Sequence, residues 1–323
     1  MKTSVRRPSV RLITSTLLLI AAPGAWAEVP TWVTDVADVR ADVPYAATDD
    51  PAQTLDLLRP RGSDPGVKLP AVVYIHGGAW AAGDKEEGYL LTSVFAGTGD
   101  YVAATLNYRL SGQAAWPAQI HDVKAAIRFL RAHADEYGID ANRIAVIGLS
   151  AGGHLAAMLG TTVGNKTLEG TVGGADGYSS RVQCVVDYCG PTDLATLLKS
   201  PLSGGSLDLA PYIVTLLNVP GWYLPTAAKA ASPLTYVTRD DAPTLIIHGT
   251  KDWLIPLSQA QTFDSALAKA RAETHLLLVD GGGHGDYFPW TLLFEKTVAF
   301  VDYQFYRLGT NLPRTQTVPA ELP

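Results

Sequence analysis

The stretch that decides the fold is Arg143-Ile144-Ala145-Val146-Ile147-Gly148-Leu149-Ser150-Ala151-Gly152. Its first half is an apolar, β-branched run of the kind that a fully buried strand needs. Its second half is a G-x-S-x-G sequence, after which residues 150–159 fit a helix. A serine in such a sharp strand-to-helix turn has an exposed hydroxyl, and glycines flank it because side chains would clash there. The stretch therefore predicts a nucleophilic serine, Ser150, at the end of a buried strand.

Similar patterns recur on both sides of this stretch. Further apolar runs predict buried strands at 71–75, 101–106, 182–186, 244–247 and 276–279. Helical patterns lie at 117–137, 258–270 and 290–305. Residues 39–45 and 53–58 read as an antiparallel opening hairpin. Strands that alternate with helices predict an α/β fold, with a mostly parallel sheet covered by helices on both faces.

A glycine pair follows the predicted strand at 71–75, in His76-Gly77-Gly78-Ala79-Trp80. Glycines after a buried strand leave bare backbone N–H groups that can face a substrate. Gly77 and Gly78, together with the N–H of Ala151, are therefore the predicted oxyanion hole. The alternative interpretation of the pair is an ordinary glycine turn.

The predicted serine needs a base and an acid that orients the base. Of the seven histidines, His284 alone lies in a glycine-rich loop after the last predicted strand, and the others fall in the glycine loop, on helices or at strand ends. Asp252, in the loop after the strand at 244–247, is the predicted acid, with Asp280 as the alternative. The order Ser150, Asp252, His284 is the order found in hydrolases of this motif class. His284 would take the proton of Ser150, and Asp252 would hold the imidazole in its tautomer.

These motifs together resemble the α/β-hydrolase fold carboxylesterases, in the branch that joins BD-FAE-like (feruloyl-esterase-like) and hormone-sensitive-lipase-like esterases. The resemblance runs from about residue 53 to residue 305. Its carriers are Leu55 to Pro60, His76 to Trp80, Gly83 to Lys85, Asn107 to Leu110, Gly148 to His154, Gly190 to Asp193 and the loops around Asp252 and His284. It implies a central sheet of about eight strands, ester hydrolysis through an acyl-enzyme, and neither a cofactor nor a metal. Ala79 stands where many lipase-like relatives have a third glycine, which fits the H-G-G-x-W branch better.

The resemblance also frames the expected substrate. Short-chain esters, or acetyl and feruloyl esters on plant polysaccharides, are the expected substrate class. Trp80, Trp253 and Phe288 are candidates for the substrate pocket, although simple packing would explain each of them equally well. No long N-terminal cap is evident, so we expect an open site that residues 191–232, a small helical excursion, partly cover. Two other readings stay open: a prolyl-oligopeptidase-like peptidase and a non-catalytic binding protein on the same fold.

The first 27 residues have the features of an export signal. Basic residues precede an apolar run at 12–22, and Ala25-Trp26-Ala27 supplies a small-x-small cleavage pattern. The run is shorter than the roughly 20 residues that span a bilayer. We expect a secretory signal peptide that is cut after Ala27, and a mature protein that is periplasmic or secreted. The alternative is an uncleaved N-terminal anchor. Residues 28–308 then form one catalytic domain, and residues 309–323 a loose tail.

Composition limits the remaining possibilities. The 323 residues carry a net charge of −6 and are 47% hydrophobic, which excludes an intrinsically disordered chain. No basic block interleaved with aromatic residues is present, so nucleic acid is not an expected partner, and no other run is apolar enough to cross a membrane. Cys184 and Cys189 are too few for a disulfide scaffold and too far apart in an extended strand to pair, so two buried thiols are expected. The oligomeric state is not predicted.

Overall fold

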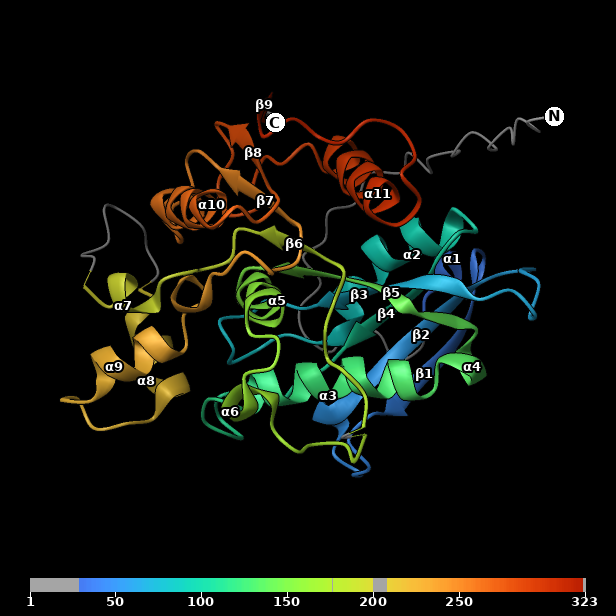
Figure 1. Ribbon diagram of the computed structural model, residues 1–323, viewed down its shortest axis with the longest axis horizontal. Helices are drawn as coiled ribbons and strands as arrows, with labels where there is room; N and C mark the ends of the chain where they lie inside the picture. The colour runs from blue at the N-terminus through green and yellow to red at the C-terminus, as the bar shows by residue number, and fades with distance from the viewer. Residues whose placement is uncertain (1–28, 176, 200–207, 322–323) are drawn as a thin grey trace.

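The computed structural model describes residues 29–175, 177–199 and 208–321 (Figure 1). The predicted signal peptide and its cleavage point lie outside the described residues. A nine-stranded sheet runs through the described part of the chain in the order β1-β2-β4-β3-β5-β6-β7-β8-β9. The strands are β1 Ala37–Pro44, β2 Thr54–Pro60, β3 Leu69–Ile75, β4 Val102–Leu106, β5 Ile139–Leu149, β6 Cys184–Tyr188, β7 Thr244–Gly249, β8 Thr274–Asp280 and β9 Thr315–Pro319.

Strand direction agrees with the sequence prediction. β1 pairs with β2, and β2 with β4, in antiparallel register, which confirms the opening hairpin. All the other neighbours are parallel. Parallel strands bring their carboxyl ends to one edge of the sheet, so the loops after β3, β5, β7 and β8 meet there. These are the loops that carry the predicted site residues.

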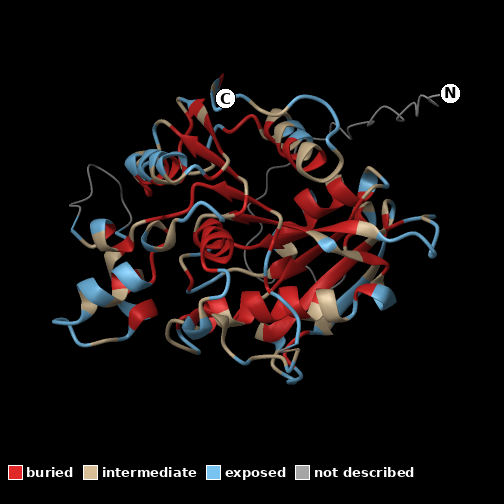
Figure 2. Ribbon diagram, in the orientation of Figure 1, coloured by how far each residue is buried: buried red, intermediate tan, exposed pale blue. Residues whose placement is uncertain are grey.

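Helices cover both faces of the sheet. The longer helices are α2 Tyr89–Gly97, α3 Ala118–Ala132, α5 Ala151–Thr161, α8 Ala210–Leu217, α10 Ser258–Ala270 and α11 Trp290–Tyr306. The shorter helical segments are α1 Thr31–Thr34, α4 Ala134–Tyr137, α6 Lys166–Glu169, α7 Leu194–Leu197, α9 Leu224–Ala230, η1 Pro51–Gln53, η2 Lys85–Gly88 and η3 Pro233–Tyr236. Successive side chains of β3 point to opposite faces of the sheet, and each face is covered by helices. Val73 lies in a core shared with α3 and α5, and Val72 lies in a core shared with α2 and α11. Figure 2 shows α5 and the central strands as the most deeply buried elements.

The predicted helix at 117–137 is present with a break. α3 ends at Ala132, His133 leaves the helical region, and α4 continues to Tyr137. Gly138 then adopts a left-handed conformation with φ 64°, as glycine does at helix ends.

The C-terminal segment differs from the expectation of a loose tail over 309–323. Residues Thr315–Pro319 form β9, which extends the sheet beside β8 in parallel register. Val318 is buried, and its neighbours in the strand are largely exposed. Backbone hydrogen bonds hold an edge strand on the sheet, so its sequence needs few buried apolar side chains.

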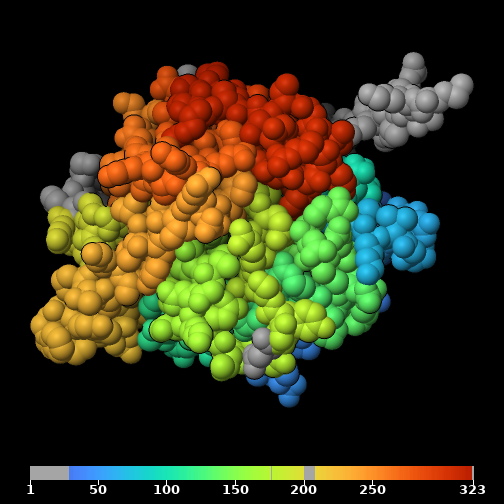
Figure 3. Space-filling model, viewed as in Figure 1, coloured from blue at the N-terminus to red at the C-terminus, as the bar shows by residue number. Residues whose placement is uncertain are grey.

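The excursion at 191–232 is helical where the structure describes it, with α7, α8 and α9 (Figure 1). In the space-filling view, atoms in the yellow-to-orange colours of this part of the chain lie at one end of the molecule (Figure 3). Hydrogen bonds tie it to the main body: Trp116 N–H donates to the Leu216 carbonyl, and Thr192 N–H donates to the side-chain oxygen of Gln259 in α10. The N-terminal helix α1 packs against β1 and α2 instead, away from the loop after β5 (Figure 1). No N-terminal cap therefore lies over Ser150 within the described residues.

Two further expectations can be checked in the described part of the chain. Cys184 and Cys189 are both buried free thiols, as predicted. None of the described helices combines the length and the apolar character needed to cross a membrane.

Candidate active site

Ser150 occupies a strained turn between β5 and α5. Its backbone has φ 57° and ψ −118°, a region that non-glycine residues rarely adopt. The Tyr188 carbonyl accepts its N–H at 2.7 Å and helps to hold the turn. A Cβ at Gly148 would lie 2.1 Å from the Gly152 carbonyl oxygen, and one at Gly152 would lie 2.0 Å from that of Ile75. Only glycine fits at these two flanking positions, as the motif predicts.

A hydrogen-bonded chain joins Ser150 to the two other predicted residues. The Ser150 hydroxyl Oγ lies 2.9 Å from His284 Nε2. His284 Nδ1 lies 2.9 Å from Asp252 Oδ2. A hydroxyl can therefore pass its proton to an imidazole that a carboxylate holds in one orientation, which is the arrangement of nucleophilic acyl transfer. Asp280, the alternative acid, instead accepts a hydrogen bond from the Thr250 hydroxyl.

The carboxylate of Asp252 is buried and surrounded by donors. The backbone N–H groups of Leu254 and Ile255 donate to Oδ1 at 2.9 and 2.7 Å. Burial by itself would raise the pKa of Asp252, but its hydrogen bond to His284, its electrostatic interactions with the His284 and His248 rings, and the Ile255 N–H together hold it below its usual value. Asp252 is thus kept ionised and fixed beside His284.

The glycine loop after β3 lies against this turn. A Cβ on Gly77 would lie 3.4 Å from Ser150 Cβ, which places the Gly77 backbone beside the serine. Among the residues that the structure describes, neither Gly77 nor Gly78 gives its backbone N–H to a protein acceptor. Ala151 is the first residue of α5, so its N–H has no acceptor within the helix. These three N–H groups are free to stabilise a developing oxyanion.

The predicted substrate contacts of Trp80 and Phe288 are wrong for this structure, because both side chains are almost fully buried. Trp80 Nε1–H donates to His154 Nδ1 at 3.1 Å, and the His154 ring packs edge-on against the indole. His154 Nε2–H in turn donates to the Ala231 carbonyl at 2.7 Å. Phe288 packs against Trp290. Trp80 therefore ties the glycine loop to α5 and to the end of the excursion.

Trp253 is placed differently from these two aromatic residues. Its side chain is 43% exposed, and its ring centroid lies 6.2 Å from that of His284. Its Nε1–H donates to Asp286 Oδ2 at 2.7 Å, which joins the acid loop to the histidine loop. Trp253 is the one of the three predicted aromatic residues that presents a surface beside the site.

Cys189 stands near the same cluster. Its thiol, an Asp252 oxygen and a His284 nitrogen lie within 4.8 Å of one another, a spacing that a metal ion could use. Burial and the charge of Asp252 hold the pKa of the thiol well above its usual value, so the thiol stays protonated and is a poor ligand. Asp252 and His284 are also bonded to each other, so the geometry fits a proton-transfer chain better than a metal centre.

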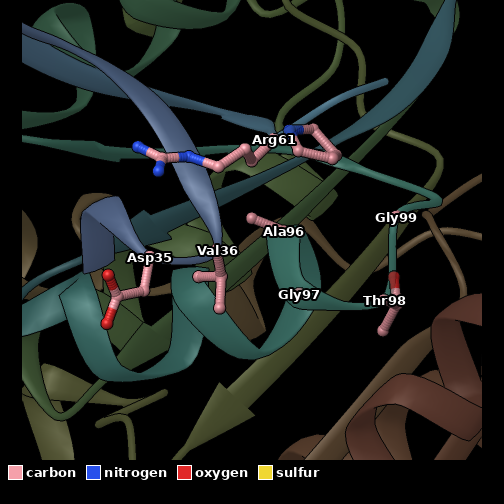
Figure 4. Close-up of a pocket in the computed structure, with 8 residues that line it drawn as sticks. Asp35, Val36, Arg61, Ala96, Gly97, Thr98 and Gly99 are labelled. Carbon is pink, nitrogen blue, oxygen red and sulfur yellow. The ribbon is translucent and has the colours of Figure 1, made fainter. Parts of the chain in front are cut away.

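The hollows described in the structure lie elsewhere. One is lined by Asp35, Val36, Pro60, Arg61, Ala96, Gly97, Thr98 and Gly99 (Figure 4). It lies beside the segment that precedes β4, at the opposite edge of the sheet from Ser150. The other is lined by residues of α7, α9 and η3 and does not include Ser150 either.

Sequence reasoning missed two buried histidines that support the site. The sequence places His154 on a helix and His248 at a strand end, and it indicates no role for either. His154 lies in the first turn after the serine, and His248 lies four residues before Asp252. Both spacings were visible in the sequence, but only the fold shows what each ring contacts.

Comparisons with known proteins agree with this geometry. The family model described as BD-FAE matches residues 55–267. Esterase LipC of Mycobacterium tuberculosis is 36% identical over 239 residues, which cover 73% of this chain and 58% of LipC. The chain spans about half the length of the curated relatives it matches.

The fold of this chain is also similar to that of esterases of known structure. A truncated carbohydrate esterase from gut microbiota aligns with a TM-score of 0.76 and 31% identity, over 83% of this chain and 96% of that one. Esterase Est2 of Thermogutta terrifontis, with propionate bound, aligns with a TM-score of 0.65 and 26% identity, over 86% and 96%. These similarities confirm the α/β-hydrolase fold.

Proposed function

The chain belongs to the BD-FAE family, and on that basis we propose that it is a serine carboxylic ester hydrolase that works through an acyl-enzyme. The observation that carries the proposal is the chain from Ser150 Oγ through His284 to Asp252, with two links of 2.9 Å, beside free backbone N–H groups. A binding protein on this fold would have no need for all three residues in this alignment. The names of the similar proteins, which are esterases, support the same reaction class.

Each residue has a distinct role in the proposed reaction. His284 Nε2 takes the proton of Ser150 as the hydroxyl oxygen attacks the ester carbonyl. Asp252 stabilises the imidazolium that forms. The N–H groups of Gly77, Gly78 and Ala151 bind the oxyanion, and the N-terminus of α5 adds a favourable dipole. The imidazolium then gives its proton to the departing alcohol, and water releases the acid from the acyl-enzyme.

The proposed substrates are short-chain esters or acetyl and feruloyl esters on plant polysaccharides, either small molecules or polysaccharide-linked. Propionate in the Thermogutta esterase and the carbohydrate esterase from gut microbiota are the similarities that support these two choices. Trp253, exposed beside His284, is the proposed contact for an aromatic or sugar group. The excursion at 191–232 is proposed to cover part of an otherwise open site.

An exported location is part of the proposal. The support is the sequence pattern of the first 27 residues, which predicts a signal peptide cut after Ala27 and a periplasmic or secreted enzyme. Mass spectrometry of the N-terminus of the protein recovered from its native host tests this directly. A mature chain that starts at Glu28 supports export, and an intact N-terminus contradicts cleavage.

The test of the reaction is an ester panel with the wild type and Ser150→Ala. The panel contains p-nitrophenyl esters from acetate to dodecanoate, methyl ferulate and acetylated xylan. We expect turnover by the wild type and a loss of about 10⁶-fold in kcat in the variant, as for other triad serines. Hydrolysis of peptides without hydrolysis of esters would instead favour the peptidase reading.

A further inference from the structure

Asp252 has a second histidine beside it. His248, near the end of β7, has its Nε2 atom 3.3 Å from Asp252 Oδ2, and neither side chain has any solvent exposure. The same Nε2 atom lies 2.9 Å from the carbonyl oxygen of Ile255. The N–H of Ile255 donates to the other carboxylate oxygen of Asp252. His248, Asp252 and Ile255 thus form a closed unit that holds the acid loop in one shape.

The neighbours of the His248 ring determine where its proton lies. Nε2 faces only acceptors, a carbonyl and a carboxylate, so it carries the hydrogen and donates. Nδ1 is buried and has no hydrogen-bond partner among the described residues. A bare ring nitrogen tolerates that environment better than a buried N–H without an acceptor. Burial lowers the pKa of His248, although the charge of Asp252 and the Ile255 carbonyl raise it, so the ring stays neutral.

We propose that His248 is a positioning residue that shares the negative charge of Asp252 and thereby sets the pH at which His284 becomes a base. The proposal rests on the proposed function, since it concerns the same site. The neutral Nε2–H of His248 stabilises part of the negative charge on Asp252 Oδ2, which would otherwise interact with His284 alone. The negative charge that Asp252 offers to an imidazolium at His284 is then smaller than that of an unshared carboxylate.

The described residues place titratable groups of three neighbouring segments near His248 and His284. The groups near His248 and His284 from the neighbouring elements are Cys189 after β6, Asp252 in the loop after β7, and Asp286 in the loop after β8. Asp286 is bonded to Trp253, and Cys189 is a protonated thiol, so His248 is the group placed to tune Asp252. The backbone N–H groups of Leu254 and Ile255 keep Oδ1 in place when His248 changes.

The experiment compares His248→Met and His248→Gln, side chains of similar length of which only glutamine has an N–H donor. The readout is the pH profile of kcat/KM for p-nitrophenyl acetate, whose acid limb reports the base of the free enzyme. We expect the midpoint in the methionine variant to move upward by about half a unit or more, and the glutamine variant to keep the wild-type midpoint. His275→Met, a buried histidine on β8, is the control and should leave the midpoint unchanged.

The proposal is overturned if the midpoint in the methionine variant is unchanged or lowered. It is also overturned if both variants shift equally, because the shift would then come from altered packing and not from the loss of the N–H donor. If these variants do not fold, the ¹⁵N spectrum of the wild-type imidazole rings decides. We expect His248 to stay in the Nε2–H form between about pH 5 and pH 9; an Nδ1–H form or a titration in that range contradicts the proposal. Failure of the proposed function is a separate outcome, seen as a wild type without ester turnover.

Discussion

Trp80 illustrates how a buried side chain can serve the site without meeting the substrate. It ends a run of three residues with positive φ, Gly78 at 91°, Ala79 at 50° and Trp80 at 58°. Such a run is strained for the two non-glycine residues and persists only because surrounding contacts hold it. The hydrogen bond from Trp80 to His154 is one of these contacts.

Trp80→Phe keeps a buried ring but removes the N–H donor. We expect kcat to fall about tenfold or more, because the N–H groups of the glycine loop lose their alignment, while KM changes little. Steady-state kinetics with p-nitrophenyl acetate measures both constants. Trp253→Phe is the matched control, since it loses an exposed hydrogen bond and should alter KM more than kcat. A Trp80→Phe enzyme with wild-type kcat would contradict the role given to this contact.

Asp187 predicts a pH dependence of stability. It is fully buried on β6, with one carboxylate oxygen bonded to the Gly190 N–H and the other without a partner among the described residues. Burial raises its pKa to about 7, although the Gly190 N–H lowers it. In the unfolded chain the pKa is about 4. The folded state therefore keeps a proton that the unfolded state has lost, and stability falls as the pH rises from about 4 to about 7.

Asp187→Asn removes this titration. Relative to the wild type, the variant should gain stability as the pH rises through that window, by an amount on the order of a few kcal/mol. Urea unfolding at about pH 4 and pH 8 measures the difference. Asp49→Asn, at an exposed position, is the control. A difference between variant and wild type that does not depend on pH would contradict the prediction.

Single residues of the site could be predicted where the signal is local or follows chain order. Ser150 lies in a short motif, and Asp252 and His284 follow strands in the expected order, so the sequence was enough to select them. The burial of Trp80 and Phe288 depends on partners such as His154, which is 74 positions away from Trp80. No local sequence pattern indicates such a partner, so the sequence alone leaves packing and substrate contact as equal alternatives for both residues, and their burial favours packing.

Among the elements, β9 shows the limit of pattern reading most clearly. Its sequence, Thr315-Gln316-Thr317-Val318-Pro319, contains one buried apolar residue. The central strands were predictable because both of their faces are buried, which demands uninterrupted apolar runs. An edge strand has no such demand. The sequence prediction likewise does not include α2. It does include α10 with its observed limits, because the apolar residues of that helix recur on one face.

β9 also allows a direct test of its place in the fold. Val318→Asp puts a charge at a position that is 5% exposed, so we expect a loss of about 2–4 kcal/mol in the free energy of unfolding. Thr317→Asp, one residue earlier in the same strand but exposed, should cost less than about 1 kcal/mol. Chemical denaturation of both variants gives the comparison. Equal, small effects would mean that this segment does not belong to the sheet in solution.

In the whole molecule, the site is assembled from segments far apart in the sequence. Loops after β3, β5, β7 and β8 meet at the carboxyl edge of the sheet, and this explains how Ser150 reaches His284 across 134 positions. That meeting could be anticipated, because parallel strands share one edge. The support beneath it, from His154 and His248, required the packed structure. The same holds for the contacts that join the described parts of the excursion to the main body.

If His284 activates Ser150 as a nucleophile, a phosphonylating reagent should react with that serine and with no other residue. The folded protein is treated with a fluorophosphonate, and the adduct is located by mass spectrometry of the intact chain and its peptides. We predict a single adduct on Ser150 in the wild type, none in Ser150→Ala, and labelling slowed by at least about 10³-fold in His284→Ala. A wild-type protein that stays unlabelled, or carries the adduct on another residue, would contradict the account.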